Sequence, residues 1–363
     1  MTLPFPIVGH FPVKQSSISS ASITIELMDY LWEETLPALL ESSLHKRLPL
    51  LEDQNTQSLR LFNGFLEGFP YLSVDLYHHT IVLFVNKVLG EESDLLVQSA
   101  RDFYLIKFPA LKCVVAKRRS SENPMLKQGE VVFGTAPDTQ ITENGITYAL
   151  EMLMNQDTSF YPDTRNLRHW LTSHSIEKTV LNTFAYTGSL GIAALAGGAS
   201  RVVQVDRNSR FLDLARKSRE LNHLDAARMK LVGADFFVVI GQMKRRSELF
   251  DLVILDPPYF SSTERGQVNL AGESTRLINK VRPLVRDGGH LVMVNNALFY
   301  SGRAFMDELE ALCASGYLSI EETIPVPPDI TGFIPSLPIN LPADPAPFNH
   351  STKIAVLKVK RKN

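Results

Sequence analysis

The feature that most constrains the fold is a regular alternation of apolar runs and amphipathic segments after Lys178. The apolar runs cover residues 179–184, 201–206, 229–235, 250–256 and 289–295. Between two of them, residues 208–221 repeat apolar side chains at helical spacing. Apolar strands that alternate with helices are typical of a parallel α/β sheet covered on both faces. A last strand at 352–360 is expected to pair antiparallel with one near 318–324.

Two segments with other sequence patterns precede this alternation. Residues 1–55 begin Pro-rich and then repeat Leu and Met at helical spacing, which predicts a helical N-terminal region. Residues 56–150 predict a small α+β domain, with strands at 59–63, 71–75, 80–85, 111–116, 130–133 and 146–150 and a helix near 92–108. Its run Lys117-Arg118-Arg119 suits a solvated turn or a phosphate contact. The α/β domain is then expected over residues 151–363.

Composition narrows the class of protein. The 37 Lys and Arg residues nearly balance 39 Asp and Glu, so any nucleic-acid binding must depend on local patches. Only Cys113 and Cys313 are present, which predicts neither a disulfide framework nor a metal site. The first residues lack a signal-peptide pattern, and no apolar run approaches the ~20 residues that span a bilayer. We therefore expect a cytoplasmic location and no membrane partner.

Polar residues stand where the predicted parallel strands end, which is where ligands bind in such sheets. Asp206 follows Gly188 at about the spacing that lets an acid meet ribose hydroxyls. Asp235 ends the next strand and can accept a hydrogen bond from an adenine amino group. The expected cofactor-binding residues in these strand ends are Phe184, Tyr186, Thr187, Gly188, Asp206, Arg207, Asp235 and Asp256.

Asp163 and Arg165 have two interpretations. Both stand near the start of a predicted helix that follows Tyr161, and they can cap and brace it. Alternatively they bind the cofactor, because a guanidinium suits a carboxylate at its amino-acid end.

Asp256-Pro-Pro-Tyr259 is the most specific motif in the chain. Pro257 and Pro258 fix φ and hold the backbone extended. Asp256 and the neighbouring carbonyl groups can accept hydrogen bonds from a base, and Tyr259 offers a ring for stacking. A nicotinamide-dependent oxidoreductase is disfavoured, because the chain has no Gly-x-Gly-x-x-Gly. We interpret this stretch as a nucleotide-type cofactor site beside a pocket for a flat, polar substrate.

In this order the motifs resemble class I S-adenosylmethionine (SAM)-dependent methyltransferases, which implies a Rossmann-like seven-stranded sheet with its last strand antiparallel. A closer resemblance is to the bacterial 23S ribosomal RNA methyltransferases of the guanine-N7/cytosine-C5 group. It is carried by Arg60-Leu-Phe-Asn-Gly64, Glu67-Gly68, Pro70, Val74-Asp75, Tyr161-Pro-Asp-Thr-Arg165, residues 181–188 and Asp256-Pro-Pro-Tyr-Phe260. The resemblance implies SAM as cofactor and ribosomal RNA as partner.

The group divides by the atom that is methylated. Cytosine C5 is a poor nucleophile, so its methylation needs a Cys thiolate. Here the strand at 289–295 ends in Asn295-Asn296, which is similar to the guanine-N7 members. Asn295 therefore joins residues 256–259 as an expected catalytic residue, and direct in-line transfer to N7 is favoured. Tyr259 departs from the Thr or Lys of that group, so adenine N6 and guanine N2 stay open, and cytosine C5 stays as a disfavoured alternative.

Two other functions remain compatible with these residues. One is a non-catalytic RNA-binding or ribosome-assembly factor, and the other is a methyltransferase that acts on a small molecule or a protein.

Overall fold

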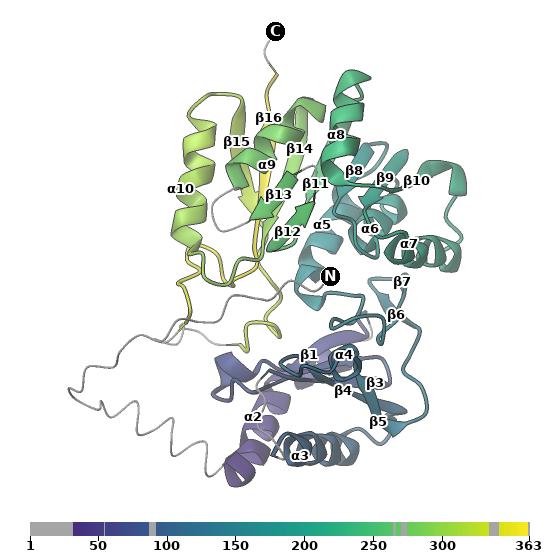
Figure 1. Cartoon of the computed structure of the whole chain (residues 1–363), viewed down its shortest axis with the longest axis vertical. Coiled ribbons are helices and arrows are strands. Elements are labelled where there is room, and N and C mark those ends of the chain that lie inside the picture. The colour runs from purple at the N-terminus through teal and green to yellow at the C-terminus, as the bar shows by residue number, and fades with distance from the viewer. Residues whose placement is uncertain are drawn as a thin grey trace, which may run out of the picture.

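The computed structural model describes residues 32–361 except 54, 87–91, 264–265, 270–273 and 334–340, and it contains two large β-sheets with their helices (Figure 1). The helical repeat expected before Trp32 lies outside the described residues. Within the described ranges, no helix has the length and apolar character needed to cross a membrane.

The smaller sheet has five strands, in the order β1-β2-β3-β4-β5. They are β1 (Ser58–Phe62), β2 (Leu72–Tyr77), β3 (Thr80–Val85), β4 (Cys113–Arg118) and β5 (Glu130–Gly134). Only β3 and β4 are parallel neighbours among them, and α3 (Glu92–Lys107) makes the crossover that parallel strands need. Helix α2 (Trp32–Glu52) and α3 share one apolar core with this sheet, which includes Leu36, Leu61 and Ala100.

A second apolar core joins the smaller sheet to the rest of the molecule. Strands β6 (Gln140–Glu143) and β7 (Ile146–Ala149) form a hairpin. Its Ile141 and Tyr148 pack with Phe84 and Val115 of the smaller sheet and with Ile192 of α6 (Ser189–Ala196). Because α6 belongs to the larger sheet's helical layer, the two sheets are in packed contact.

The larger sheet has seven strands in the order β10-β9-β8-β11-β14-β16-β15. Strands β8 (Thr179–Thr183), β9 (Arg201–Asp206), β10 (Met229–Gly233), β11 (Phe250–Leu255) and β14 (Val285–Asn295) are parallel. Strand β16 (Lys353–Val359) is antiparallel to both neighbours, β14 and β15 (Leu318–Thr323). The expected seven-stranded α/β sheet with an antiparallel last strand, preceded by a smaller α+β unit, is confirmed.

Helices cover both faces of the larger sheet, which explains why its strands are apolar throughout. Helices α8 (Phe236–Arg245), α9 (Ser274–Val281) and α10 (Gly302–Cys313) pack on one face, in a core that includes Ile240, Leu277 and Phe305. Helices α5 (Arg165–His174) and α6 pack on the other, where Leu171 and Ala193 are buried. Helix α7 (Ser209–Leu221) is next to α6 and β9, with Asn208 capping its first turn.

Several short elements were not expected from the sequence. Helix α4 (Pro124–Gln128), strand β6 and the hairpin β12 (Phe260–Thr263)–β13 (Gly266–Asn269) have four or five residues each, too few to give a clear apolar period. Strand β14 also begins at Val285 and not at residue 289.

Asp329, in the loop before β16, connects α5 on the larger sheet to β1 of the smaller sheet. Its carboxylate accepts hydrogen bonds from the Arg165 guanidinium at 2.9 and 3.0 Å and from the Arg60 backbone N–H at 2.9 Å. Its carbonyl accepts one from Arg47 of α2 at 2.7 Å, and Arg47 also pairs with Glu67 at 2.8 Å. Asp329 and Arg47 are fully buried, so these charged contacts fix the loop against the smaller sheet.

Candidate active site

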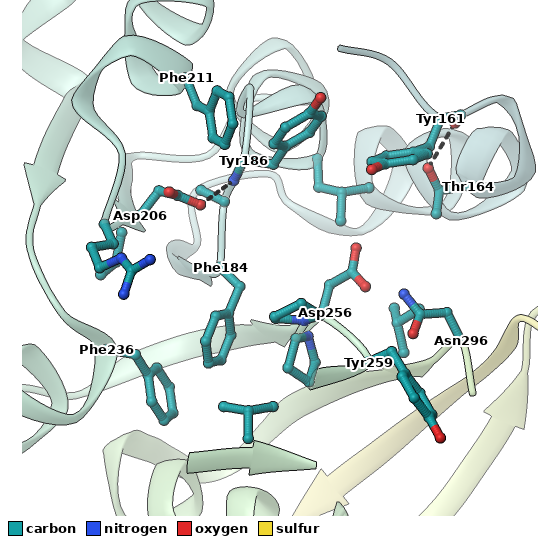
Figure 2. Close-up of a pocket in the computed structure, with 18 of the residues that line it drawn as sticks. Tyr161, Thr164, Phe184, Tyr186, Asp206, Phe211, Phe236, Asp256, Tyr259 and Asn296 are labelled. Atoms are coloured by element: carbon teal, nitrogen blue, oxygen red, sulfur yellow. Dashed lines mark hydrogen bonds between the residues drawn. The ribbon is translucent and has the colours of Figure 1, made fainter. Parts of the chain in front are cut away.

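A cavity of about 610 Å³ lies at the carboxyl ends of β8, β9, β10, β11 and β14 (Figure 2). The chain adds β9 and β10 on one side of β8 and then returns to β11 on its other side. The strand order therefore reverses between β8 and β11, which is where ligands bind in open α/β sheets. Pockets of roughly 300–1,000 Å³ usually take small-molecule ligands.

The turn after β8 has an unusual backbone. Phe184, Tyr186 and Gly188 have φ values of 53°, 50° and 80°. For the two aromatic residues this left-handed conformation costs on the order of 1–3 kcal/mol, and such strain concentrates at functional sites. The Tyr186 N–H donates to the Asp206 carboxylate at 2.8 Å, which holds the turn against β9. Gly188 is required by packing, because a Cβ there would lie 2.5 Å from that of Ala215.

Two acids stand at neighbouring strand ends, with their carboxylates fixed by backbone donors. Asp206 also accepts a hydrogen bond from the Asn208 N–H at 2.8 Å. Burial raises the pKa of Asp206, against the opposing effect of its two backbone donors. Asp235 caps α8 by accepting from the N–H groups of Phe237 and Val238 at 2.9 and 3.2 Å. Both acids line the cavity and can accept further hydrogen bonds from a polar ligand.

Aromatic rings line the cavity beside these acids. Phe184 and Phe236 are stacked with their centroids 4.4 Å apart. Tyr186 and Phe211 meet edge to face at 4.6 Å on the other side of Asp206 (Figure 2). Arg207 lines the same part of the cavity. Aromatic side chains next to two acids can bind a ligand that has one flat apolar part and one hydroxyl-rich part.

Asp256 stands at the end of β11, with its carboxylate between Phe184 and Asn296 (Figure 2). Burial raises the pKa of Asp256 to about 7, and the nearby Asp163 adds to the rise. Asp163 itself accepts a hydrogen bond from the Thr352 hydroxyl at 2.9 Å. Around neutral pH the Asp256 carboxyl can therefore either donate or accept a proton.

Tyr259 extends at the mouth of the cavity, on the same side as Asn296 (Figure 2). Its side chain is 47% exposed, although it is a large aromatic residue. Pro257 and Pro258 connect it to Asp256 and also line the cavity. An exposed ring at the rim of a polar pocket can cover the face of a flat ligand.

Most residues expected from the sequence do line this cavity. They are Asp163, Phe184, Tyr186, Asp206, Arg207, Asp235, Asp256, Pro257, Pro258 and Tyr259. The structure therefore brings together both halves of the expected site, from segments that span residues 163 to 259.

Arg165 and Thr187 are placed elsewhere. The guanidinium of Arg165 is bound by Asp329 and by the Ser58 carbonyl at 2.6 Å, and it does not line the cavity. Of its two interpretations, these contacts support the bracing role. Thr187 is buried and donates its hydroxyl to the Ser159 carbonyl at 2.6 Å.

Asn295 does not line the cavity either, but the next residue, Asn296, does. The Asn295 side chain is fully buried, donates to the Ser274 hydroxyl at 3.0 Å and accepts from the Ala297 N–H at 3.0 Å. Asn296 lines the cavity. Consecutive residues at a strand end face opposite ways, which explains why one of the two asparagines points inward.

Other residues of the cavity were missed. Arg119, Asp157, Tyr161, Thr164, Phe211, Phe237 and Thr352 line it as well. Tyr161 opens the Tyr161-Pro-Asp-Thr-Arg165 motif, and Arg119 ends the basic run Lys117-Arg118-Arg119, so the sequence did single out the segments that hold both residues. Thr352 carried none, because it reaches the cavity from the distant start of β16.

Neither cysteine lines the cavity. Cys113 is buried in β4 of the smaller sheet, and Cys313 ends α10. These are the chain's only two cysteines, so no thiol is available to attack a ligand there.

A separate cluster of metal-binding residue types lies at the turn between β2 and β3. Potential ligand atoms of His78, His79 and Asp138 lie within 4.8 Å of one another, and none of the three residues lines the cavity.

Comparisons with known proteins agree with this geometry. Residues 126–339 match the model of the S-adenosylmethionine-dependent methyltransferase family. A ribosomal RNA large subunit methyltransferase I from Aeromonas salmonicida is 31% identical over 62% of this chain and 57% of its own length. A putative ribosomal RNA large subunit methyltransferase, YwbD of Bacillus subtilis, is 28% identical over 75% of this chain and 69% of its own.

The fold is similar to that of a solved structure, SMU.776, described as a putative methyltransferase complexed with SAH. The TM-score is 0.78 at 24% identity, over 90% of this chain and 82% of that one. The chain matches little more than half the length of the relative from Aeromonas salmonicida. The family match covers most of the described sheet and cavity, and on that ground the chain belongs to the S-adenosylmethionine-dependent methyltransferase family.

Proposed function

We propose that this protein transfers a methyl group from SAM to a nitrogen of a base in large-subunit ribosomal RNA, with guanine N7 favoured. The observation that carries the proposal is that the acids after β9 and β10 share one cavity with Asp256-Pro-Pro-Tyr259, and that no cysteine lines it. One end of the cavity suits a nucleoside-type cofactor, and the other suits a base.

The cofactor half of the cavity has the donor and acceptor set that SAM requires. Asp206 would accept hydrogen bonds from the ribose hydroxyls, since its half-buried carboxylate is already oriented by two backbone donors. Asp235 would accept from the adenine amino group, with Phe184 and Phe236 packing on the ring system. Asp163, near Asp256, would face the amino-acid end. The arrangement fits the cofactor without any cation from Arg165.

The substrate half would hold a flat base. Asp256 and the carbonyl groups of Pro257 and Pro258 would accept hydrogen bonds from ring and amino N–H groups. Tyr259 would cover one face of the base, and Asn296, at the end of the neighbouring strand β14, offers both a donor and an acceptor. The aromatic ring and the carboxylate together would fix the plane and the direction of the acceptor nitrogen.

The chemistry then depends on positioning. Bound SAM supplies a methyl group on a sulfonium, which is already activated for displacement. A correctly oriented donor and acceptor can account for up to about 7–11 kcal/mol of the barrier. Guanine N7 has a free lone pair, so its attack breaks the S–CH₃ bond and forms N–CH₃ without covalent help. Cytosine C5 would need a thiolate, which this cavity lacks.

RNA is proposed as the substrate because of the curated relatives, whose names describe large-subunit ribosomal RNA methyltransferases. Action on ribosomal RNA implies a cytoplasmic location. The formal net charge of −2 requires that RNA be bound by local groups and not by overall charge.

A second candidate acceptor is an exocyclic amine, adenine N6 or guanine N2. The observation that favours it is the pKa of Asp256, which burial raises to about 7. An amine loses a proton when it is methylated, and a carboxylate of that pKa can accept it. N7 methylation releases no proton, so the two candidates differ in their need for this group.

The test is methyl transfer from labelled SAM to ribosomal RNA purified from cells that lack this gene. We expect label in large-subunit RNA and none in free nucleosides or total protein. The Cys113→Ala/Cys313→Ala variant should retain the wild-type rate, because neither thiol touches the cavity. Label in protein or in a small molecule, or loss of transfer in that folded variant, would refute the proposal.

A further inference from the structure

The cavity is not built by the larger sheet alone. Arg119 follows β4 of the smaller sheet, and its side chain lines the same cavity as Asp206 and Asp256. Its backbone N–H donates to the Val85 carbonyl at 3.0 Å, which fixes it to the end of β3. A cation from the smaller sheet therefore stands at the same cavity as Asp206, Asp235 and Asp256, the strand-end acids of the larger one.

The three consecutive cations 117–119 have different surroundings. Lys117 is buried and donates to the carbonyl groups of Gln128 and Asn155, and burial lowers the pKa of Lys117 to about 8. Arg118 pairs with Asp94 at 2.5 Å and with Glu130. Both cations are bound by neighbouring protein groups, and neither lines the cavity.

Arg119, unlike Lys117 and Arg118, is held mainly by stacking on an aromatic ring. Its guanidinium lies 4.4 Å from the centroid of the Phe84 ring, and stacking of this kind fixes the plane while leaving the N–H edge free to bind. Its ion pair with Asp157 has a length of 3.4 Å, and the Arg119 side chain is 42% exposed. Such a long, exposed pair contributes little and is readily exchanged for a stronger anion.

A base inserted between Asp256 and Tyr259 stays attached to its sugar and phosphate. The phosphate group of that nucleotide must then lie at the rim of the cavity, where the RNA backbone continues. A planar guanidinium at the rim can bind two phosphate oxygens at once. We propose that Arg119 is a phosphate-binding residue for the RNA strand that carries the target base. The inference rests on the proposed function, and it assigns the smaller sheet a direct part in holding the substrate.

The test compares Arg119→Ala with Arg118→Ala and Arg119→Lys. Binding of large-subunit ribosomal RNA from cells lacking the gene is measured by fluorescence anisotropy over a series of salt concentrations. SAM affinity is measured by calorimetry on the same samples, and steady-state transfer is followed with each variant. Arg118→Ala is the matched control, because it removes an adjacent cation that the cavity does not use.

We expect Arg119→Ala to weaken RNA binding roughly tenfold and to reduce the salt slope by about one. The KM for RNA should rise while the SAM affinity stays unchanged, and Arg119→Lys should recover part of the loss. Arg118→Ala should resemble the wild type in every measurement.

Two results would overturn the assignment and spare the proposed function. One is wild-type RNA binding and transfer by Arg119→Ala. The other is a loss of SAM affinity in that variant with RNA binding intact, which would assign Arg119 to the cofactor carboxylate. If the wild type neither binds nor methylates the RNA, the proposed function fails and this site fails with it.

Discussion

The Asp206 carboxylate accepts a hydrogen bond from the backbone N–H of Tyr186 at 2.8 Å. This contact joins the end of β9 to the strained turn after β8, so one acid both shapes the cavity and faces into it. In the proposed function these two roles make Asp206 the central residue of the cofactor half of the site.

Asp206→Ala should weaken SAM binding. The variant loses the ribose acceptor and releases the Tyr186 turn, and hydrogen bonds to charged groups contribute about 1.5–3 kcal/mol each. Calorimetry should therefore show a Kd at least tenfold higher. Asp213→Ala, an exposed acid on α7 paired with Arg216, is the matched control and should bind SAM as the wild type does. Normal affinity in Asp206→Ala would remove the cofactor assignment.

Asp256 should make stability depend on pH. Its folded pKa of about 7 lies above the ordinary value of 3.8, so the folded state binds more protons than the unfolded state between those pH values. Stability of the free protein should then fall as pH rises from about 4 to 7, by at most about 1.4 kcal/mol per pH unit from this group. Asp256→Asn should flatten this dependence in urea unfolding. An equal slope in both proteins would contradict the assigned pKa.

The same residue separates the two candidate acceptors. Asp256→Ala should leave SAM affinity unchanged and lower the rate of transfer, whichever nitrogen is methylated. If the acceptor is an exocyclic amine, wild-type transfer should also fall below pH 7 as the carboxylate becomes protonated. Single-turnover rates from pH 5.5 to 8.5 measure this, and an N7 acceptor predicts a weaker dependence.

Tyr259 should act through its ring and not through its hydroxyl. Its half-exposed position at the cavity mouth suits stacking on a base, which is worth about 1–3 kcal/mol. Tyr259→Ala should lower transfer roughly tenfold to a hundredfold with SAM affinity intact, and Tyr259→Phe should restore most of the rate. An inactive Tyr259→Phe would show that the hydroxyl group is what matters.

Asp329 should be a major determinant of stability. Asp329→Ala leaves the Arg165 guanidinium buried without its bidentate partner and also removes an acceptor for the Arg60 N–H. Breaking a buried pair in this way typically costs about 3–5 kcal/mol. Urea unfolding should report that loss, whereas Asp102→Ala, which breaks an exposed pair with Arg101, should leave the midpoint unchanged. A small effect of Asp329→Ala would mean that the loop is held by other contacts.

The larger sheet could be predicted because its signal is local and strong. Strands buried on both faces are largely apolar, and the acids at or just after the ends of β9, β10 and β11 interrupt those runs at visible points. The cofactor side of the cavity follows from strand ends, whose residues share one edge of a parallel sheet. For this reason the sequence could predict that Asp206, Asp235 and Asp256 line one cavity.

What the sequence could not predict depends on partners far along the chain. A guanidinium suits any carboxylate, and only the fold shows that Arg165 meets Asp329, 164 residues away. Arg119 lines the cavity only because the two sheets pack together, and no local sequence pattern predicts that packing. The choice between Asn295 and Asn296 depended on the register of β14, where a one-residue error reverses which side chain points inward.

The central claim is tested most directly by identifying the methylated nucleoside. Large-subunit RNA from cells lacking the gene is incubated with the purified protein and SAM, digested and analysed by mass spectrometry. The cavity, with its Asp-Pro-Pro-Tyr segment and no thiol, predicts one new 7-methylguanosine, absent from untreated RNA and present in wild-type RNA. A new N6-methyladenosine or N2-methylguanosine would select the alternative acceptor. A new 5-methylcytidine, or no methylated base at all, would contradict direct transfer to a base nitrogen.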